Sequence, residues 1–265
     1  QSAQQLATIV APALGGLLYA FGSVWVYGPT VVLYLIACGL TLNLPARQTP
    51  LNKAKATMDS LLAGIRFIRS RPDILGAISL DLFAVLLGGA TALLPVFAKD
   101  ILLTGAWGLG LLRSAPAVGA LLMSLWLARF SVDRHVGRVM FTAVGVFGVA
   151  TIAFGLSTSF WFSLAVLVVL GAADMISMVI RASFVQLETP DEMRGRVSAV
   201  NGLFIGASNQ LGEFESGITA HWFGTVPAVV MGGIGTLLVT GVWIKLFPTL
   251  ANRDRMHVPV EEAKL

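Results

Sequence analysis

The chain has few charged residues and almost no cysteine or histidine. Charged residues make up 12 % of its 265 residues, against roughly 25 % in a soluble domain. The single Cys38 lies in an apolar segment, so the sequence predicts neither a disulfide framework nor a Cys-x-x-Cys metal site. Three scattered histidines and the lack of a Walker-type glycine loop argue against a metal cluster and against ATP as the energy source.

The chain instead contains long apolar segments. Hydrophobic residues make up 56 % of the chain, and the mean hydropathy is +0.81. A helix needs roughly 20 mostly apolar residues to cross a bilayer. Six of eight segments reach that length, and the first and fifth reach it with a few flanking residues. The eight segments are 6–21, 24–44, 74–98, 107–128, 139–156, 160–180, 197–220 and 226–247.

Lysine and arginine gather on alternate connections between these segments. Because basic residues mark the cytoplasmic side of a membrane, the pattern predicts eight spans with both ends of the chain in the cytoplasm. The formal charge of +4 follows from this distribution, so we do not expect a nucleic-acid partner. The basic connections are 45–73, 129–138 and 181–196, together with the tail after 247.

The only long hydrophilic connection, 45–73, separates two apolar segments from six. Its apolar residues recur at helical spacing, with charged residues on the other face, so we expect an amphipathic helix on the cytoplasmic surface. The apolar face consists of Met58, Leu61, Leu62, Ile65 and Ile68.

This organisation resembles the second half of a major facilitator superfamily transporter, which has two six-helix halves around a central cavity. The resemblance implies an all-α membrane protein with eight transmembrane helices, corresponding to helices 5–12 of a twelve-helix fold. Since the chain starts at Gln1, we expect it to be part of a longer protein that supplies the first four helices. The implied divisions are the last two helices of the N-terminal half (1–44), a linker (45–73), a six-helix bundle (74–248) and a cytoplasmic tail (249–265).

A first short motif lies in segment 6–21. The residues from Ala11 to Gly16 resemble the GPxxGG signature of facilitator drug–proton antiporters, with Ala11 in place of the first glycine. Pro12 permits a kink, and Gly15 and Gly16 permit close approach of another helix. Ordinary small-residue packing is the alternative interpretation.

A second motif follows the fourth segment and reads Asp133-Arg134-His135-Val136-Gly137-Arg138. It resembles the facilitator motif D-R-x-G-R-[RK], with one extra residue before the glycine. A compact turn of this kind can clamp neighbouring helix ends in the inward-closed state. Positive-inside charge alone explains the arginines, but it does not explain Asp133 together with Gly137.

The stretch 171–217, which contains the gating-type triplet Arg194-Gly195-Arg196, resembles the family of transmembrane secretion effectors, to which bacterial siderophore exporters belong. This resemblance implies a proton-driven exporter of siderophore- or drug-like molecules in the bacterial inner membrane. It implies a small-molecule substrate, the lipid bilayer and the missing helices as partners. Neither an enzymatic activity nor a cofactor is implied, because the proton gradient would supply the energy.

Ionisable residues inside spans are expensive to bury and are therefore candidate functional residues. Asp81 and Asp174 are candidate proton-coupling acids, although Asp81 could also reach interfacial water. Arg113 could meet an anionic substrate or neutralise a neighbouring acid. Arg181 could pair in the cavity, mark the cytoplasmic boundary or pair with Glu188.

The seventh segment is the most polar. Small and polar residues follow one another at offsets of three and four and predict a cavity wall or a close helix contact; they are Gly202, Gly206, Asn209, Glu213 and Gly217. Glu213 and Asn209 are therefore candidate cavity residues, and Gln210 a candidate substrate contact. Glu215 lies about 200° from Glu213 around the helix, so we expect it to be structural or paired with a base.

These residues suggest a mechanism. A carboxylate in a low-dielectric cavity can bind and release protons near neutral pH, so competition between protons and substrate could drive export by alternating access. Two alternatives remain open: a lipid-translocating facilitator, and a non-transporting membrane scaffold or truncated product.

Overall fold

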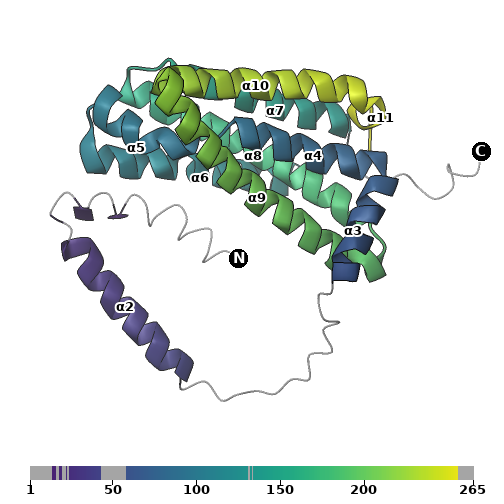
Figure 1. Cartoon of the computed structure of the whole chain (residues 1–265), viewed down its shortest axis with the longest axis horizontal. Coiled ribbons are helices and arrows are strands. Elements are labelled where there is room, and N and C mark those ends of the chain that lie inside the picture. The colour runs from purple at the N-terminus through teal and green to yellow at the C-terminus, as the bar shows by residue number, and fades with distance from the viewer. Residues whose placement is uncertain are drawn as a thin grey trace, which may run out of the picture.

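The computed structural model describes residues 14–15, 18–19, 22, 24–42, 58–130, 132 and 134–255, and every regular element in these ranges is helical (Figure 1). Short helical turns separate or follow the long helices: η1 (Ala90–Leu93), α5 (Leu94–Val96), η2 (Phe97–Ile101) and α11 (Pro248–Ala251). The long helices are α2 (Val24–Leu42), α3 (Met58–Ser70), α4 (Pro72–Leu87), α6 (Gly105–Arg129), α7 (Val136–Gly155), α8 (Phe160–Glu188), α9 (Asp191–Phe223) and α10 (Thr225–Leu246).

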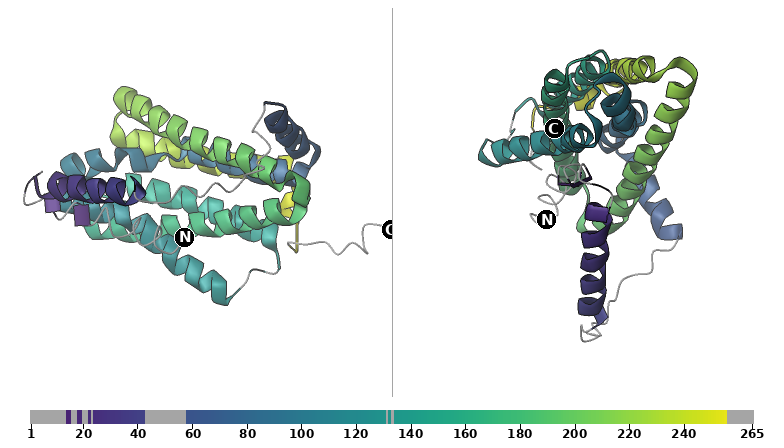
Figure 2. Two further views of the ribbon diagram at one scale, coloured as in Figure 1. Left: turned by 90° about the horizontal axis from the view of Figure 1, so that it is seen from below. Right: turned by 90° about the vertical axis from the view of Figure 1, so that its left-hand side faces the viewer.

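The helices from α4 onward form one bundle, which α9 crosses diagonally in Figure 1. The most extensive packing joins α8 to α6 and to α7, α10 to α7, and α4 to both α9 and α10. Helix α2 has no buried residue and points away from the bundle in the right-hand view of Figure 2. An apolar helix without a protein partner needs lipid or further helices to cover it.

Six segments of the described chain are long and apolar enough to cross a membrane. They coincide with six of the eight predicted spans. Segment 6–21 lies largely outside the described residues. Segment 197–220 forms part of α9, which is helical over 33 residues but is more polar and is not among the six. The six are Val24–Leu42, Pro72–Ile101, Gly105–Arg129, Val136–Gly155, Phe160–Glu188 and Thr225–Leu246.

The third predicted span is interrupted, which the sequence pattern did not indicate. Helix α4 ends at Leu87, and the chain continues through Gly88 and Gly89 into η1, α5 and the π-helical turn η2. Adjacent glycines are a common cause of such breaks. At Gly89 a Cβ would lie only 2.5 Å from the Ser216 Oγ and 2.7 Å from the Gly212 carbonyl oxygen. The break therefore lets α4 and α9 approach closely.

The predicted amphipathic helix is α3, and it packs against protein. Ile68 is buried in a cluster with Val197 and Val200 of α9, and a Cβ on Gly64 would lie 3.0 Å from the Arg196 carbonyl oxygen. Leu62 remains half exposed. Helix α3 thus packs against the first turns of α9, at the same end of the bundle as α11 (Figure 1).

Candidate functional site

A polar cavity opens between α4, α6, α8 and α9. One part, of about 380 Å³, is lined by Gly88, Gly89, Arg113, Asp174, Asn209 and Glu213, among others. An adjoining space of about 630 Å³ shares Thr91, Arg113, Pro116 and Glu213 with it and adds Gln210. We call the two together the central cavity.

Opposite charges face this cavity without neutralising each other. Arg113 projects from α6, and Glu213 and Asn209 come from α9. The described residues supply neither Arg113 nor Glu213 with a salt-bridge partner. Convergent polar groups in a cavity of this size are typical of a small-molecule site, and both charges remain available to a ligand.

The interruption after α4 forms part of the cavity wall. Gly88, Gly89 and Thr91 line it, and the Gly88 N–H closes the end of α4 by donating to the Ala84 carbonyl oxygen at 2.9 Å. The Thr236 hydroxyl of α10 donates to the same carbonyl at 3.1 Å. Broken helices place backbone polar groups beside substrate sites in transporters, and this break lies beside the central cavity.

A buried charge group adjoins the central cavity. Asp81 of α4 and Arg181 of α8 form an ion pair, and their exposed fractions are only 8 % and 5 %. Asp174 shares with Asp81 and Ser177 a space of about 10 Å³, enough for one water at most. Because Asp174 also lines the central cavity, it connects the cavity to the ion pair.

The structure gives Arg181 a partner other than Glu188, and it does not test whether Arg181 marks the cytoplasmic boundary. Arg181 does not mark the end of its helix, because α8 continues to Glu188. It does not pair with Glu188 either, since Glu188 binds Arg253. An unpaired buried guanidinium is strongly destabilising, and Asp81 on the facing helix provides its counter-charge.

Glu215 lies away from the residues that line the central cavity. Its carboxylate accepts a hydrogen bond from the Thr219 hydroxyl at 2.7 Å. Among the described residues it forms no salt bridge with a base, so pairing with a base stays a prediction.

The predicted stripe of small residues on α9 makes no close helix contact within the described part of the chain. A Cβ on Gly202, Gly206 or Gly217 would meet no described residue within 4 Å. The close contact with α4 is made by another face, where Ser208 and Ser216 are buried and a Cβ on Gly212 would lie 2.9 Å from the Leu86 carbonyl oxygen. The offset of four between these serines and Gly212 was the signal that the sequence analysis missed.

A second ionic cluster, also missed, lies at the basic end of the bundle. The Arg253 guanidinium donates to Asp73 Oδ2 of α4 at 2.8 Å and to the Glu188 carboxylate of α8. It also lies 5.5 Å from the centre of the Phe184 ring, and Thr249 donates to Asp73 at 2.7 Å. The start of the predicted tail is therefore bound to the bundle.

The motif after the fourth predicted span meets this same segment. The Gly137 N–H donates to the Arg253 carbonyl oxygen at 3.0 Å, and a Cβ on Gly137 would collide with the Leu250 carbonyl oxygen. The His135 N–H, at a φ of 54°, donates to Asp254 at 3.1 Å. Arg134 and Arg138 are exposed, and Asp133 lies outside the described residues.

The other motif residues have local contacts or cannot be placed. In the first turn of α9, Arg194 pairs with Asp191 at 2.7 Å, Arg196 donates to the Met193 sulfur at 3.4 Å, and Gly195 faces open space. Pro12 and Gly16 fall outside the described ranges, and a Cβ on Gly15 would have no neighbour within 4 Å.

No group of three or more histidine, cysteine or acidic side chains in the described ranges could hold a metal ion. The six candidate spans and the polar cavity are together typical of a multi-pass helical membrane protein.

Comparison with known proteins identifies the family of this membrane protein. Residues 1–213 match the Major Facilitator Superfamily. The chain belongs to this family of membrane transporters, which are not enzymes, and the resemblance seen in the sequence is confirmed.

Curated relatives include the enterobactin exporter EntS from Escherichia coli O1:K1, from Escherichia coli O157:H7 (strain EC4115) and from Shigella boydii serotype 18. Each is 28 % identical over 236 residues, which cover 88 % of this chain and 53 % of the relative. The chain thus spans about half the length of these relatives. No solved structure matches it.

Proposed function

We propose that this chain forms part of a secondary active transporter that exports siderophore- or drug-like molecules across the bacterial inner membrane by proton antiport. The observation that carries the proposal is the central cavity, which Arg113 and Glu213 both line without a salt bridge to any described residue. The likeness to exporters of enterobactin supports the direction of transport and the substrate class.

The side chains divide into two groups in this mechanism. Arg113, Asn209 and Gln210 bind polar or anionic groups of the substrate, and Glu213 and Asp174 exchange protons. In the buried charge group beside the central cavity, Asp81 and Asp174 are both close enough to the single guanidinium of Arg181 to be attracted by it. A proton on either acid makes that group neutral, so proton binding changes the attraction between α4 and α8.

The proposed architecture has eight transmembrane helices, corresponding to helices 5–12 of a twelve-helix fold. Residues 1–44, with α2, belong to the N-terminal half, 45–73 form the linker, 74–248 the C-terminal bundle and 249–265 the tail. The open glycine face of α9, at Gly202, Gly206 and Gly217, is where the N-terminal half would close the cavity. Alternating access follows when the two halves rock around this site.

An efflux measurement tests the proposal. Cells that lack their own exporters would express the complete open reading frame, and the accumulation of a catecholate siderophore and of a cationic dye would be followed with and without a proton uncoupler. We expect lower accumulation of at least one compound, and we expect the uncoupler to abolish the difference.

Unchanged accumulation of both compounds would contradict export of these substrates. Translocation of a fluorescent phospholipid by the same cells would then favour the lipid-moving alternative. A lack of both activities in a correctly inserted protein would favour the scaffold.

A further inference from the structure

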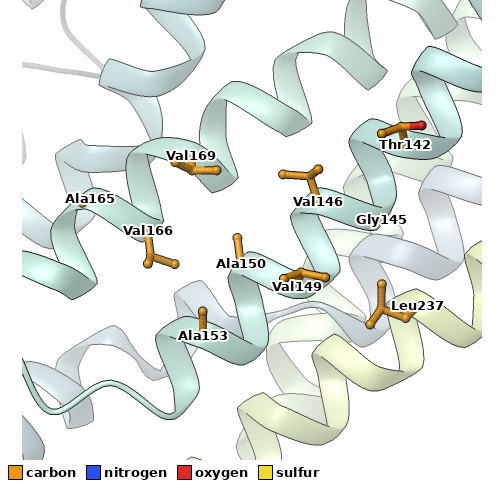
Figure 3. A pocket seen from close by; sticks show the side chains of 10 residues that line it. All are labelled: Thr142, Gly145, Val146, Val149, Ala150, Ala153, Ala165, Val166, Val169 and Leu237. Atoms are coloured by element: carbon orange, nitrogen blue, oxygen red, sulfur yellow. The ribbon is translucent and has the colours of Figure 1, made fainter.

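An apolar groove separate from the central cavity lies between α7 and α8, with Leu237 of α10 at its edge (Figure 3). Its volume is about 590 Å³, and it shares no lining residue with the central cavity. Valines form much of its wall, and Val146, Val149 and Val169 are 40 %, 57 % and 49 % exposed.

Small residues make the groove hollow. Gly145 and Ala150 of α7 and Ala165 of α8 line it between the valines (Figure 3), and a Cβ on Gly145 would meet no atom of the described residues within 4 Å. The volume falls in the range of about 300–1,000 Å³ typical of ligand sites. Both α7 and α8 are candidate spans, so the groove faces the hydrocarbon region of a bilayer.

One end of the groove is polar. Thr142 lines both the groove and a second pocket of about 380 Å³, which Arg138 and Asn252 also line. Arg138 precedes Thr142 by about one helical turn. The pocket thus continues the groove toward the start of α7, where the basic residues of the connection 129–138 lie.

The polar groups of this pocket are free within the described chain. Arg138 is exposed and has no salt bridge with a described residue. Threonine hydroxyls within helices often bond their own helix, and three others in this bundle do so: Thr151, Thr236 and Thr240 each donate to the carbonyl four residues earlier. By contrast, the described residues offer the Thr142 hydroxyl no hydrogen bond, which leaves it available to a ligand.

We propose that the groove and this pocket together bind one anionic phospholipid of the bilayer. An acyl chain fills the groove, and the phosphate is bound by Arg138 with Thr142 and Asn252. A basic pocket beside transmembrane helices is suited to an anionic headgroup, and a zwitterionic headgroup gives Arg138 no net charge to neutralise. This inference does not depend on the transport proposal.

The headgroup part of the site is tested with the complete chain in detergent. Native mass spectrometry would count bound lipid after addition of equal amounts of dioleoyl phosphatidylglycerol and dioleoyl phosphatidylcholine. We expect about a fivefold preference for phosphatidylglycerol, from the effect of one basic residue. Arg138→Gln should remove the preference and Arg138→Lys should keep it. Arg66→Gln is the matched charge control, because Arg66 is an exposed residue of α3 that lines neither the groove nor the pocket.

The acyl-chain part is tested by filling the groove. Gly145→Leu should reduce the bound phosphatidylglycerol at least threefold, whereas Gly241→Leu should not. Gly241 is the matched control because it is also a mid-helix glycine whose Cβ would meet open space, and it does not line the groove. Helix content by circular dichroism would identify a misfolded variant.

Equal retention of the two lipids by the unaltered chain would overturn the proposal. An unchanged preference in Arg138→Gln would overturn it as well, and this result stands even if Gly145→Leu fails to fold. Full lipid retention by a folded Gly145→Leu variant would place the lipid elsewhere on the bundle.

Discussion

At the residue scale, the distinction that matters is between charges that are paired and charges that are not. Arg181 and Asp81 are buried and neutralise each other, so their pairing holds α4 against α8. Arg113 and Glu213 face the central cavity and form no salt bridge within the described residues. The first pair therefore joins the two helices, and the proposal gives the second two residues a substrate or a proton to bind.

Glu213→Gln should uncouple transport from the proton gradient. The amide has the size of the carboxylate but cannot exchange a proton at neutral pH. We expect uncoupler-sensitive efflux to fall by roughly a hundredfold or more, because a positioned proton-transfer group contributes about 10²–10⁴-fold, while insertion is unchanged. Efflux from cells and the amount of protein in the membrane are the two measurements.

Glu215→Gln is the matched control, because Glu215 lies on the same helix but binds Thr219 and not the cavity. Equal losses in the two variants would contradict a special role for Glu213.

Asp81→Asn should destabilise the bundle, because it leaves the buried Arg181 without its counter-charge. Removing one partner of a buried ion pair costs about 3–5 kcal/mol. A fall in the thermal unfolding midpoint of the purified protein would measure the loss. The double variant Asp81→Asn with Arg181→Met should recover much of it, since no unpaired charge then remains. A single variant as stable as the unaltered protein would contradict the structural role of the pair.

At the scale of elements, glycine positions decide how closely the helices pack. Gly171 of α8 lies against the Pro116 carbonyl oxygen of α6, and Gly119 of α6 lies against the Val168 carbonyl oxygen of α8, so a Cβ at either position would collide with backbone. Gly206 of α9, by contrast, faces open space. Glycine thus allows close packing at Gly171 of α8, whereas Gly206 of α9 contacts no other helix among the described residues.

Gly171→Ala and Gly206→Ala should therefore have opposite effects on stability. Overpacking costs about 1–3 kcal/mol, which exceeds the gain of about 1 kcal/mol from replacing a helical glycine by alanine. We expect Gly171→Ala to lower the thermal midpoint and Gly206→Ala to maintain or raise it. A lower midpoint for Gly206→Ala would mean that its face is covered by another part of the protein.

At the scale of the whole molecule, Arg253 connects distant parts of the chain. It joins Asp73 at the start of α4 to Glu188 at the end of α8, while its carbonyl oxygen accepts the Gly137 N–H of α7. Three helices are fixed at the basic end by one residue that follows the last helix. One residue after α11 therefore links the ends of α4, α7 and α8.

Arg253→Gln should loosen that end. Because two charge-assisted hydrogen bonds are lost, we expect amide exchange over 136–140 to accelerate by roughly tenfold, which corresponds to about 1.4 kcal/mol. Hydrogen–deuterium exchange of the detergent-solubilised chain would measure it. Arg255→Gln is the control, because Arg255 is exposed and contributes only a carbonyl oxygen to Arg253. Equal exchange in the two variants would contradict the role of Arg253.

The sequence alone determined that this is a helical membrane protein of the major facilitator type. Segment length, hydropathy and helical periodicity are local properties, so six spans and the amphipathic α3 were predictable near their observed bounds. The polarity of α9 was also predictable, and with it the candidates Asn209 and Glu213, which the structure places together with Arg113 and Asp174. These residues share one cavity because each lies on the inward face of its own helix.

Only the tertiary structure decided which charges meet. Asp81 and Arg181 are 100 residues apart in the sequence, and Asp73 and Arg253 are 180 residues apart. Such pairing depends on how each helix is rotated and where its neighbours end, which a single sequence does not specify. The same holds for the break at Gly88 and Gly89, because the close contact with α9 gives the glycines their role. Local hydropathy fixes what enters the membrane, and long-range packing fixes the partners of its polar residues.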